Sequence, residues 1–296
     1  MAWSEKRYEE LVEILNSTKR PPDVYPDEIK AYKDLAAYET VEREAGGHTY
    51  YLYVRQAKNR IPDAPLYIYL HGGCWAVGHA ECDDYYSGYM ADQIRGTVID
   101  VDYTTSFQAD IHVMYAQTRD AIEYAVENAA TLGCSPERIV IGGYSAGGHL
   151  TAGVLIRMLE EGKCPFAGVI LAYAPLDLRP KASQAPATPR DEAMQVRGAA
   201  YEELALRGDD AIRYDHIVSP LLTAKQLLQK LPRMMVISAQ LCEFKEQDEE
   251  FAKTISQIGV ETTSCRFMRS AHGFIPHFRQ EWKEACARTA RFIKSC

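Results

Sequence analysis

Short apolar runs alternate with longer amphipathic segments along most of the chain. The apolar runs have the length of buried β-strands and lie at residues 66–70, 97–101, 138–141, 167–172, 234–238 and 262–267. The amphipathic segments place apolar residues at helical spacing, at residues 112–132, 146–159, 246–258 and 282–293. Strands that alternate with helices indicate βαβ units and a mostly parallel sheet with helices on both faces. The pattern therefore predicts an α/β fold.

Two stretches do not follow this alternation. Residues 1–37 read as helical but contain three prolines, and residues 179–217 are polar and contain prolines before a helical patch at about 192–206. Long insertions in compact domains are usually functional or disordered. We therefore expect one domain over residues 1–296, with lid elements at residues 1–37 and 179–217; the alternative is surface decoration.

A glycine-rich turn follows the apolar run at 138–141. Gly143-Tyr-Ser-Ala-Gly147 matches the G-x-S-x-G pattern between a predicted strand and a predicted helix, which is the setting that this turn requires. The glycines allow a sharp bend that lifts the Ser145 hydroxyl above the sheet, and the helix N-terminus favours developing negative charge. Ser145 is therefore our candidate nucleophile; the alternative is a turn without chemistry.

A second glycine pair follows the apolar run at 66–70. The loop reads His-Gly-Gly-Cys-Trp over residues 71–75, and its glycines let the backbone approach a ligand closely. Acyl transfer places a full negative charge on the former carbonyl oxygen, which backbone N–H groups can stabilise. We expect the N–H groups of Gly72, Gly73 and Ala146 to form this oxyanion hole, with His71 organising the loop.

A base and an acid would complete a catalytic triad with Ser145. His272 comes shortly after the last predicted strand, at the same edge of the sheet as Ser145, so its imidazole can take the serine proton; His277 is the alternative. The acid should follow the preceding strand, where Glu243 can accept the ring N–H of the histidine. Asp248 and Asp177 are its rivals.

These motifs resemble a known family. His71-Gly-Gly-Cys-Trp, Gly143-Tyr-Ser-Ala-Gly-Gly-His-Leu, Ser219-Pro-Leu and His272-Gly-Phe together resemble the hormone-sensitive-lipase-like and acetyl-esterase families, from about residue 66 to the C-terminus. The resemblance implies the α/β-hydrolase fold, with a mostly parallel eight-stranded sheet flanked by helices. It also assigns Ser145 as nucleophile, His272 as base, and Gly72 and Gly73 to the oxyanion hole.

The chain departs from the family pattern at three places. Cys74 stands where the family often has a third glycine, and Glu243 and Gln247 stand where it usually has two aspartates. The Asp102-Tyr103 pair is followed by Thr-Thr-Ser-Phe, where the family has arginine and proline. The loop and serine motifs are also similar to those of arylformamidases and of esterases that act on xylan side chains.

Composition and charge indicate which classes of partner and which cellular location to expect. The net charge is −8, and no run of lysine and arginine exceeds two residues, so nucleic acid is not an expected partner. We expect no signal peptide, because the N-terminal segment lacks an apolar core, and no apolar stretch is long enough to span a bilayer. The eight cysteines are scattered without a CxxC spacing, which is typical of reduced thiols and predicts a cytoplasmic protein.

The expected function is hydrolysis of a small-molecule ester through an acyl-enzyme, with no metal or organic cofactor. Cys74, Trp75, Tyr103 and Tyr144 are candidates for the substrate pocket, with ordinary core packing as the alternative for the aromatic residues. The family resemblance suggests a short acyl group. Amide hydrolysis with the same triad, as in arylformamidases, is one alternative, and a non-catalytic ligand-binding protein on a hydrolase scaffold is another. A homo-oligomer is compatible with the sequence.

Overall fold

The computed structural model describes residues 3–17, 23–180 and 189–296. Within these residues the strands form one eight-stranded sheet in the order β1-β2-β4-β3-β5-β6-β7-β8. The strands are β1 (Ala36–Ala45), β2 (His48–Ala57), β3 (Ala64–Leu70), β4 (Thr97–Asp102), β5 (Cys134–Tyr144), β6 (Gly168–Ala172), β7 (Arg233–Leu241) and β8 (Thr262–Ala271). Strands β3 to β8 are parallel to one another, and β2 is antiparallel to both β1 and β4. The predicted mostly parallel sheet is confirmed.

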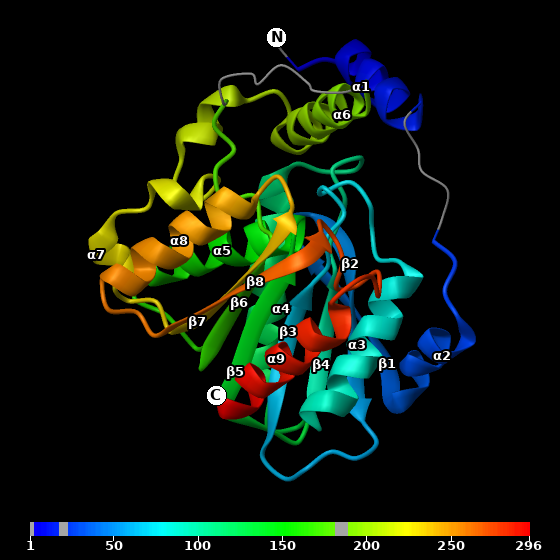
Figure 1. The fold of residues 1–296 in the computed structure, drawn as a ribbon, viewed down its shortest axis with the longest axis vertical. Coiled ribbons are helices and arrows are strands. Elements are labelled where there is room, and N and C mark those ends of the chain that lie inside the picture. Colours follow the sequence, from blue (N-terminus) through cyan, green and yellow to red (C-terminus); the bar gives the residue numbers. More distant parts are fainter. Residues whose placement is uncertain (1–2, 18–22, 181–188) are drawn as a thin grey trace.

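Helices cover both faces of the sheet (Figure 1). They are α1 (Glu5–Ser17), α2 (Asp27–Lys30), α3 (Glu81–Ile94), α4 (Ile111–Asn128), α5 (Ala146–Glu160), α6 (Pro189–Leu206), α7 (Lys225–Leu228), α8 (Lys245–Gln257) and α9 (Trp282–Ser295). Short 3₁₀ turns lie at Ala31–Leu35, Asp210–Tyr214 and Pro220–Leu222. Helices α4, α5 and α8 contribute to one hydrophobic core, and α3 and α9 contribute to a second core on the opposite face.

The β1–β2 hairpin was not predicted from the sequence. Its turn contains Gly46 and Gly47, both at positive φ, which a tight hairpin turn requires and glycine adopts readily. Alternate residues of β2 point into the core: Tyr50, Leu52 and Val54 are almost fully buried. The hairpin extends the parallel sheet by two strands beyond β4.

Helices α1 and α6 lie together above the C-terminal ends of the strands (Figure 1). A separate hydrophobic cluster joins them, in which Leu11 and Leu15 of α1 pack with Leu204 of α6. The guanidinium of Arg7 donates two hydrogen bonds to the carboxylate of Glu203, at 2.7 and 2.6 Å. Both expected lid stretches therefore contribute to one layer, although residues 1–2, 18–22 and 181–188 of them lie outside the described residues.

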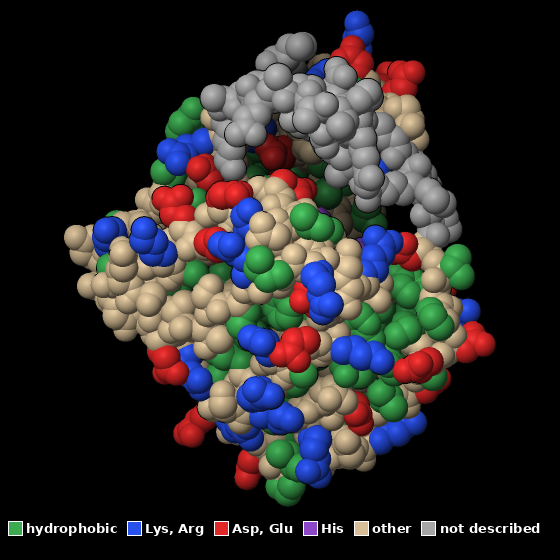
Figure 2. All heavy atoms as spheres, viewed as in Figure 1, with side chains coloured by type: hydrophobic (Ala, Val, Ile, Leu, Met, Phe, Trp, Pro, Cys, Tyr) green, Lys and Arg blue, Asp and Glu red, His purple; other side chains and the backbone are tan. Residues whose placement is uncertain are grey.

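The surface carries charges of both signs. On the described part of the face in Figure 2, lysine and arginine side chains are interspersed with aspartate and glutamate side chains. None of the helices in the described ranges combines the length and the apolar character needed to cross a membrane.

Candidate active site

Ser145 occupies a strained turn between strand β5 and helix α5. Its backbone angles are φ 55° and ψ −123°, which non-glycine residues rarely adopt. The neighbouring glycines leave room for this turn: a Cβ at Gly143 would lie 2.4 Å from the carbonyl carbon of Gly147, and a Cβ at Gly147 would lie 2.1 Å from the carbonyl oxygen of Leu70. Larger residues at either position would push the turn, and Ser145 with it, away from the sheet.

His272 lies next to this serine. It directly follows strand β8, and its Nε2 is 2.8 Å from the Oγ of Ser145. The rings of Tyr173 and Phe244 contact the imidazole edge-on, with centroids 5.1 and 5.4 Å away. The two aromatic rings hold the imidazole at the serine, so the structure brings together two residues that are 127 positions apart.

The glycine-rich loop after β3 lies against the serine turn. A Cβ on Gly72 would come within 3.3 Å of the Cβ of Ser145, so the backbone at residue 72 lies directly beside the serine. Gly73 has φ 120°, and its carbonyl accepts a hydrogen bond from the N–H of Ala76 at 3.0 Å. This bend leaves Gly73 and Ala146 on the wall of a cavity that also includes Ser145.

Two buried histidines hold the loop from behind. The ring of His71 stacks on Tyr103 at a centroid distance of 4.3 Å, and the Tyr103 hydroxyl donates to the His71 carbonyl at 2.9 Å. The indole of Trp75 donates to Nδ1 of His149 at 3.3 Å. Burial lowers the pKa of His149 to about 4, so its imidazole is neutral and can accept this hydrogen bond. His149 is part of the serine motif and lies one helical turn after Ser145, but its contact with Trp75 was not predicted.

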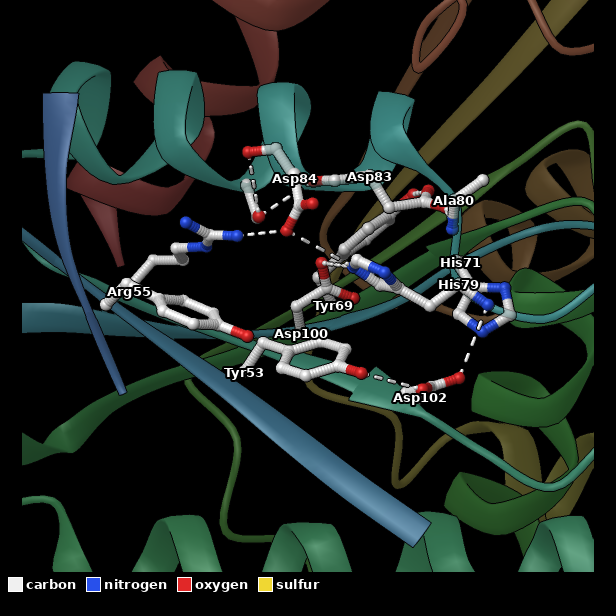
Figure 3. Close-up of polar contacts among 12 residues, drawn as sticks. Tyr53, Arg55, Tyr69, His71, His79, Ala80, Asp83, Asp84, Asp100 and Asp102 are labelled. Atoms are coloured by element: carbon white, nitrogen blue, oxygen red, sulfur yellow. Dashed lines mark hydrogen bonds and ion pairs between the residues drawn. The ribbon is translucent and has the colours of Figure 1, made fainter. Parts of the chain in front are cut away.

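His79, further along the same loop, lies among acidic residues of strand β4 and helix α3 (Figure 3). The Nε2 of His79 is 3.0 Å from a carboxylate oxygen of Asp100 on β4. The backbone N–H of His79 donates to Asp102 at 3.3 Å, and the other oxygen of Asp102 accepts a hydrogen bond from Tyr53 at 3.0 Å. The spacing of these residues does not mark them as neighbours, so no sequence pattern predicts the group.

The charges in this group favour a protonated His79. Burial alone would lower its pKa, but the attraction of Asp100, Asp83 and Asp84 outweighs burial and raises the pKa to about 9. Asp84 is itself paired with Arg55 of β2, as Figure 3 shows. The imidazolium therefore links the loop to β4 and to α3 at neutral pH.

Two side chains from the loop after β7 lie close to the imidazole of His272. The Sγ of Cys242 is 3.2 Å from Nδ1, and a carboxylate oxygen of Glu243 lies within 4.8 Å of both the thiol and the imidazole. Burial, together with the negative charge of Glu243, raises the pKa of the Cys242 thiol, so the thiol is neutral at neutral pH. The contact between Cys242 and the imidazole was not predicted.

The register of the last two strands explains this contact. Leu241 of β7 pairs with Ala271 of β8, so Cys242 and His272 are the next residues along two adjacent parallel strands. Cys242 is buried and faces the ring, whereas Glu243 is one residue further and exposed to solvent. The thiol is therefore held close to the imidazole by the register of the two strands, and the carboxylate is open to solvent.

The other candidates for base and acid have partners elsewhere. His277 lies 2.9 Å from Asp23. Asp177 forms an ion pair with Arg179 at 2.9 Å. Asp248 is fully buried and accepts a backbone N–H from the loop after β6 at 3.0 Å, and burial raises the pKa of its carboxyl group.

A cavity of about 210 Å³ opens beside Ser145. Trp75 lines it from the glycine-rich loop, Phe244 from the loop after β7, and Arg197 and Tyr201 from α6. The wall therefore combines residues of the sheet edge with residues of the layer above it, and is largely apolar around the serine.

The four residues expected at the substrate pocket separate into two pairs. Cys74 and Trp75 line the cavity. Tyr103 and Tyr144 lie instead in the two hydrophobic cores, with 1% and 0% of their surface exposed. Their rings support the loop and the serine turn from below.

Three comparisons relate this chain to known proteins. Residues 67–276 match the family model described as the alpha/beta hydrolase fold. An arylesterase from Saccharolobus solfataricus is 26% identical over 220 residues, which cover 71% of this chain and 68% of that protein. Human hormone-sensitive lipase is 29% identical over 118 residues, which cover 40% of this chain and 11% of the lipase.

The likeness extends to solved structures. A hyperthermophilic esterase from the archaeon Pyrobaculum calidifontis has a TM-score of 0.81 against this chain at 20% identity, over 100% of this chain and 99% of that one. At 20% identity, this structural similarity shows that the two chains share a fold. The resemblance to hormone-sensitive-lipase-like esterases that the motifs indicated is confirmed by the family and sequence matches.

His79 should contribute stability that is lost at alkaline pH. Its pKa is about 9 in the folded protein but about 6.5 in an unfolded chain, so the contribution is complete below about pH 6.5 and disappears as the pH rises through about 9. We expect the wild type to exceed His79→Gln in free energy of unfolding by up to about 3 kcal/mol at low pH, and by much less at pH values above the folded pKa. Urea unfolding at a series of pH values measures the difference.

His112→Gln is the matched control, because His112 is exposed at the start of α4. That variant should follow the pH dependence of the wild type. A His79→Gln variant with the same pH dependence as the wild type would show that the imidazolium does not stabilise the loop.

Proposed function

The chain belongs to the alpha/beta hydrolase fold family, and from that premise we propose that it hydrolyses small carboxylic esters with Ser145 as nucleophile. One observation carries the proposal: the Oγ of Ser145 lies 2.8 Å from Nε2 of His272, on a strained turn beside a glycine-rich loop. The curated relatives include an arylesterase and a hormone-sensitive lipase. The protein is accordingly a serine hydrolase of the carboxylesterase type.

The geometry supports a two-step reaction. The hydroxyl of Ser145 attacks the ester carbonyl while Nε2 of His272 takes its proton. His272 then returns the proton to the leaving alcohol oxygen, and an acyl-enzyme remains. Water, activated by the same imidazole, releases the acid and regenerates the serine. No step requires a metal or an organic cofactor.

The oxyanion of each tetrahedral intermediate would face three backbone N–H groups, those of Gly72, Gly73 and Ala146. The loop supports this role because residue 72 packs against Ser145 and residues 73 and 146 line the cavity. Loss of one such donor typically costs about 2.7–4 kcal/mol of transition-state stabilisation.

We propose Glu243 as the carboxylate that stabilises the imidazolium of His272. Its oxygen lies within 4.8 Å of the ring, at a distance where opposite charges still attract. Glu243 is exposed, so solvent weakens this attraction compared with a buried contact. The neutral thiol of Cys242, 3.2 Å from Nδ1, can accept the ring N–H and so keep the lone pair on Nε2.

The cavity indicates which esters fit. Its volume of about 210 Å³ and its aromatic wall at Trp75 and Phe244 support a short acyl group. Helices α1 and α6 would act as the lid, because α6 contributes Arg197 and Tyr201 to the cavity wall and α1 packs on α6.

We also propose the cytoplasm as the location of the protein. No disulfide joins any of the eight cysteines, and thiols persist in a reducing compartment.

Replacement of Ser145 by alanine should abolish ester hydrolysis. With p-nitrophenyl acetate we expect kcat to fall by at least about 10³-fold, since loss of a nucleophile or of its base removes the covalent route. His272→Ala should lower kcat by a similar factor, and the double variant should be no worse than either single variant, because the two residues act as a unit. Equal rates for the wild type and Ser145→Ala would rule out this mechanism.

Replacement of Glu243 by glutamine should lower kcat without abolishing it. We expect a loss of about 10²-fold, smaller than the roughly 10⁴-fold seen where a buried carboxylate contacts the base directly. Glu246→Gln is the control, because Glu246 is also exposed at the start of α8 and pairs with Lys245. If both variants keep the wild-type kcat, another group stabilises the imidazolium.

A further inference from the structure

Three side chains around His272 offer the donor atoms of a metal site. The Sγ of Cys242, a carboxylate oxygen of Glu243 and a ring nitrogen of His272 all lie within 4.8 Å of one another. Thiolate, imidazole and carboxylate are the three ligand types that zinc takes in proteins, and the sulfur selects against magnesium and calcium. We propose that these residues bind a thiophilic divalent cation such as Zn²⁺, and that the ion inhibits the hydrolase; the inhibition rests on the proposed function.

The two strongest donors are already close to the spacing that one ion needs. Bond lengths of about 2.3 Å to sulfur and 2.0–2.1 Å to nitrogen place tetrahedral ligands roughly 3.6 Å apart. The Sγ of Cys242 and Nδ1 of His272 are 3.2 Å apart. Both residues directly follow paired positions of β7 and β8, so the sheet holds their backbones in place. A small outward rotation of the side chains would admit the ion.

The third donor and the route of entry come from the cavity. Glu243 and His272 both line it, whereas Cys242 lies behind them and is 6% exposed. A cation that enters from the cavity meets the exposed carboxylate first and the thiol last. The fourth position of a tetrahedral ion would face the cavity, where water can occupy it.

The charges and protons balance for this ligand set. The thiol of Cys242 loses its proton to solvent and becomes a thiolate, which is the form that binds metals. Thiolate and carboxylate together cancel the two positive charges of the ion, and the imidazole of His272 binds as a neutral ligand. One proton is released for each ion bound.

Binding at Nδ1 would stop the proposed reaction through the tautomer of His272. The metal occupies the lone pair of Nδ1, so the single ring proton of the neutral imidazole must sit on Nε2. Nε2 can then donate a hydrogen bond to Ser145 but cannot accept the serine proton. The ion therefore inhibits without blocking the oxyanion loop.

Cadmium titration and zinc inhibition together test the site. Cd²⁺ should give the ultraviolet charge-transfer absorption of a cadmium–thiolate bond, saturating at one equivalent, and Cys242→Ser should lose this absorption. Zn²⁺ should inhibit p-nitrophenyl acetate hydrolysis reversibly, with recovery on addition of EDTA, while Mg²⁺ should not inhibit. Loss of an outer hydrogen-bond partner of a ligand already costs about 10- to 100-fold in metal affinity, so Cys242→Ser should weaken inhibition by more than about 100-fold.

Two further variants serve as a control and as a second test of the metal site. Cys164→Ser removes an exposed cysteine outside the site and should retain both the absorption and the inhibition. Glu243→Gln changes an exposed side chain and should weaken inhibition about 10-fold or more, even if Cys242→Ser fails to fold. Zinc inhibition of equal strength in the wild type, Cys242→Ser and Glu243→Gln would overturn the proposal.

The absorption does not depend on catalysis, so the two proposals can fail separately. A protein with the Cys242-dependent absorption but no esterase activity would keep the metal site and reject the proposed function. An active esterase without that absorption would keep the function and reject the site.

Discussion

The contact between the hydroxyl of Ser145 and the imidazole of His272 depends on a strained backbone. A serine at φ 55° is held there only because the flanking glycines let α5 and the loop after β3 approach closely. The strain is offset by the packing of the parallel strands, which bring the ends of β5 and β8 to one edge of the sheet. The proposed catalytic geometry and the stability of the fold are therefore coupled at this turn.

The surroundings of Ser145 and His272 differ between the side of the glycine-rich loop after β3 and the side of the loop after β7. Behind the glycine-rich loop, buried acidic groups fix a charged His79, and a neutral His149 holds Trp75. On the far side of His272 the Nδ1 nitrogen lies 3.2 Å from the neutral sulfur of Cys242, and the carboxylate of Glu243 is exposed. The loop is thus supported by buried contacts, while the proposed base is oriented by a weaker acceptor, the sulfur through which we propose that the site binds soft cations.

Burial determines how much of the fold and of the candidate site could be predicted from the sequence. Strands β3, β4 and β6 are buried along nearly their whole length and appear as apolar runs, so they were predicted to within two residues of their ends. Strands β5 and β7 have partly exposed residues near their ends, and only their apolar middle parts were predicted. Strand β2 mixes buried and partly exposed residues, and α3 buries tyrosine, cysteine and aspartate alongside Met90, Ala91 and Ile94. Neither element shows a clear apolar pattern, so neither was located from the sequence. Ser145 and His272 lie in recognisable motifs. The contacts of Cys242 and of His79 arise from strand register and from packing between distant elements, which spacing along one chain does not encode.

Labelling with a fluorophosphonate probe tests the central claim most directly. Such a probe reacts with a serine only when a neighbouring base and an oxyanion hole activate the hydroxyl. We expect one label per chain, located on Ser145 by peptide mass spectrometry, and a much slower reaction in His272→Ala. A label on another residue, or equal labelling of the wild type and Ser145→Ala, would contradict the account.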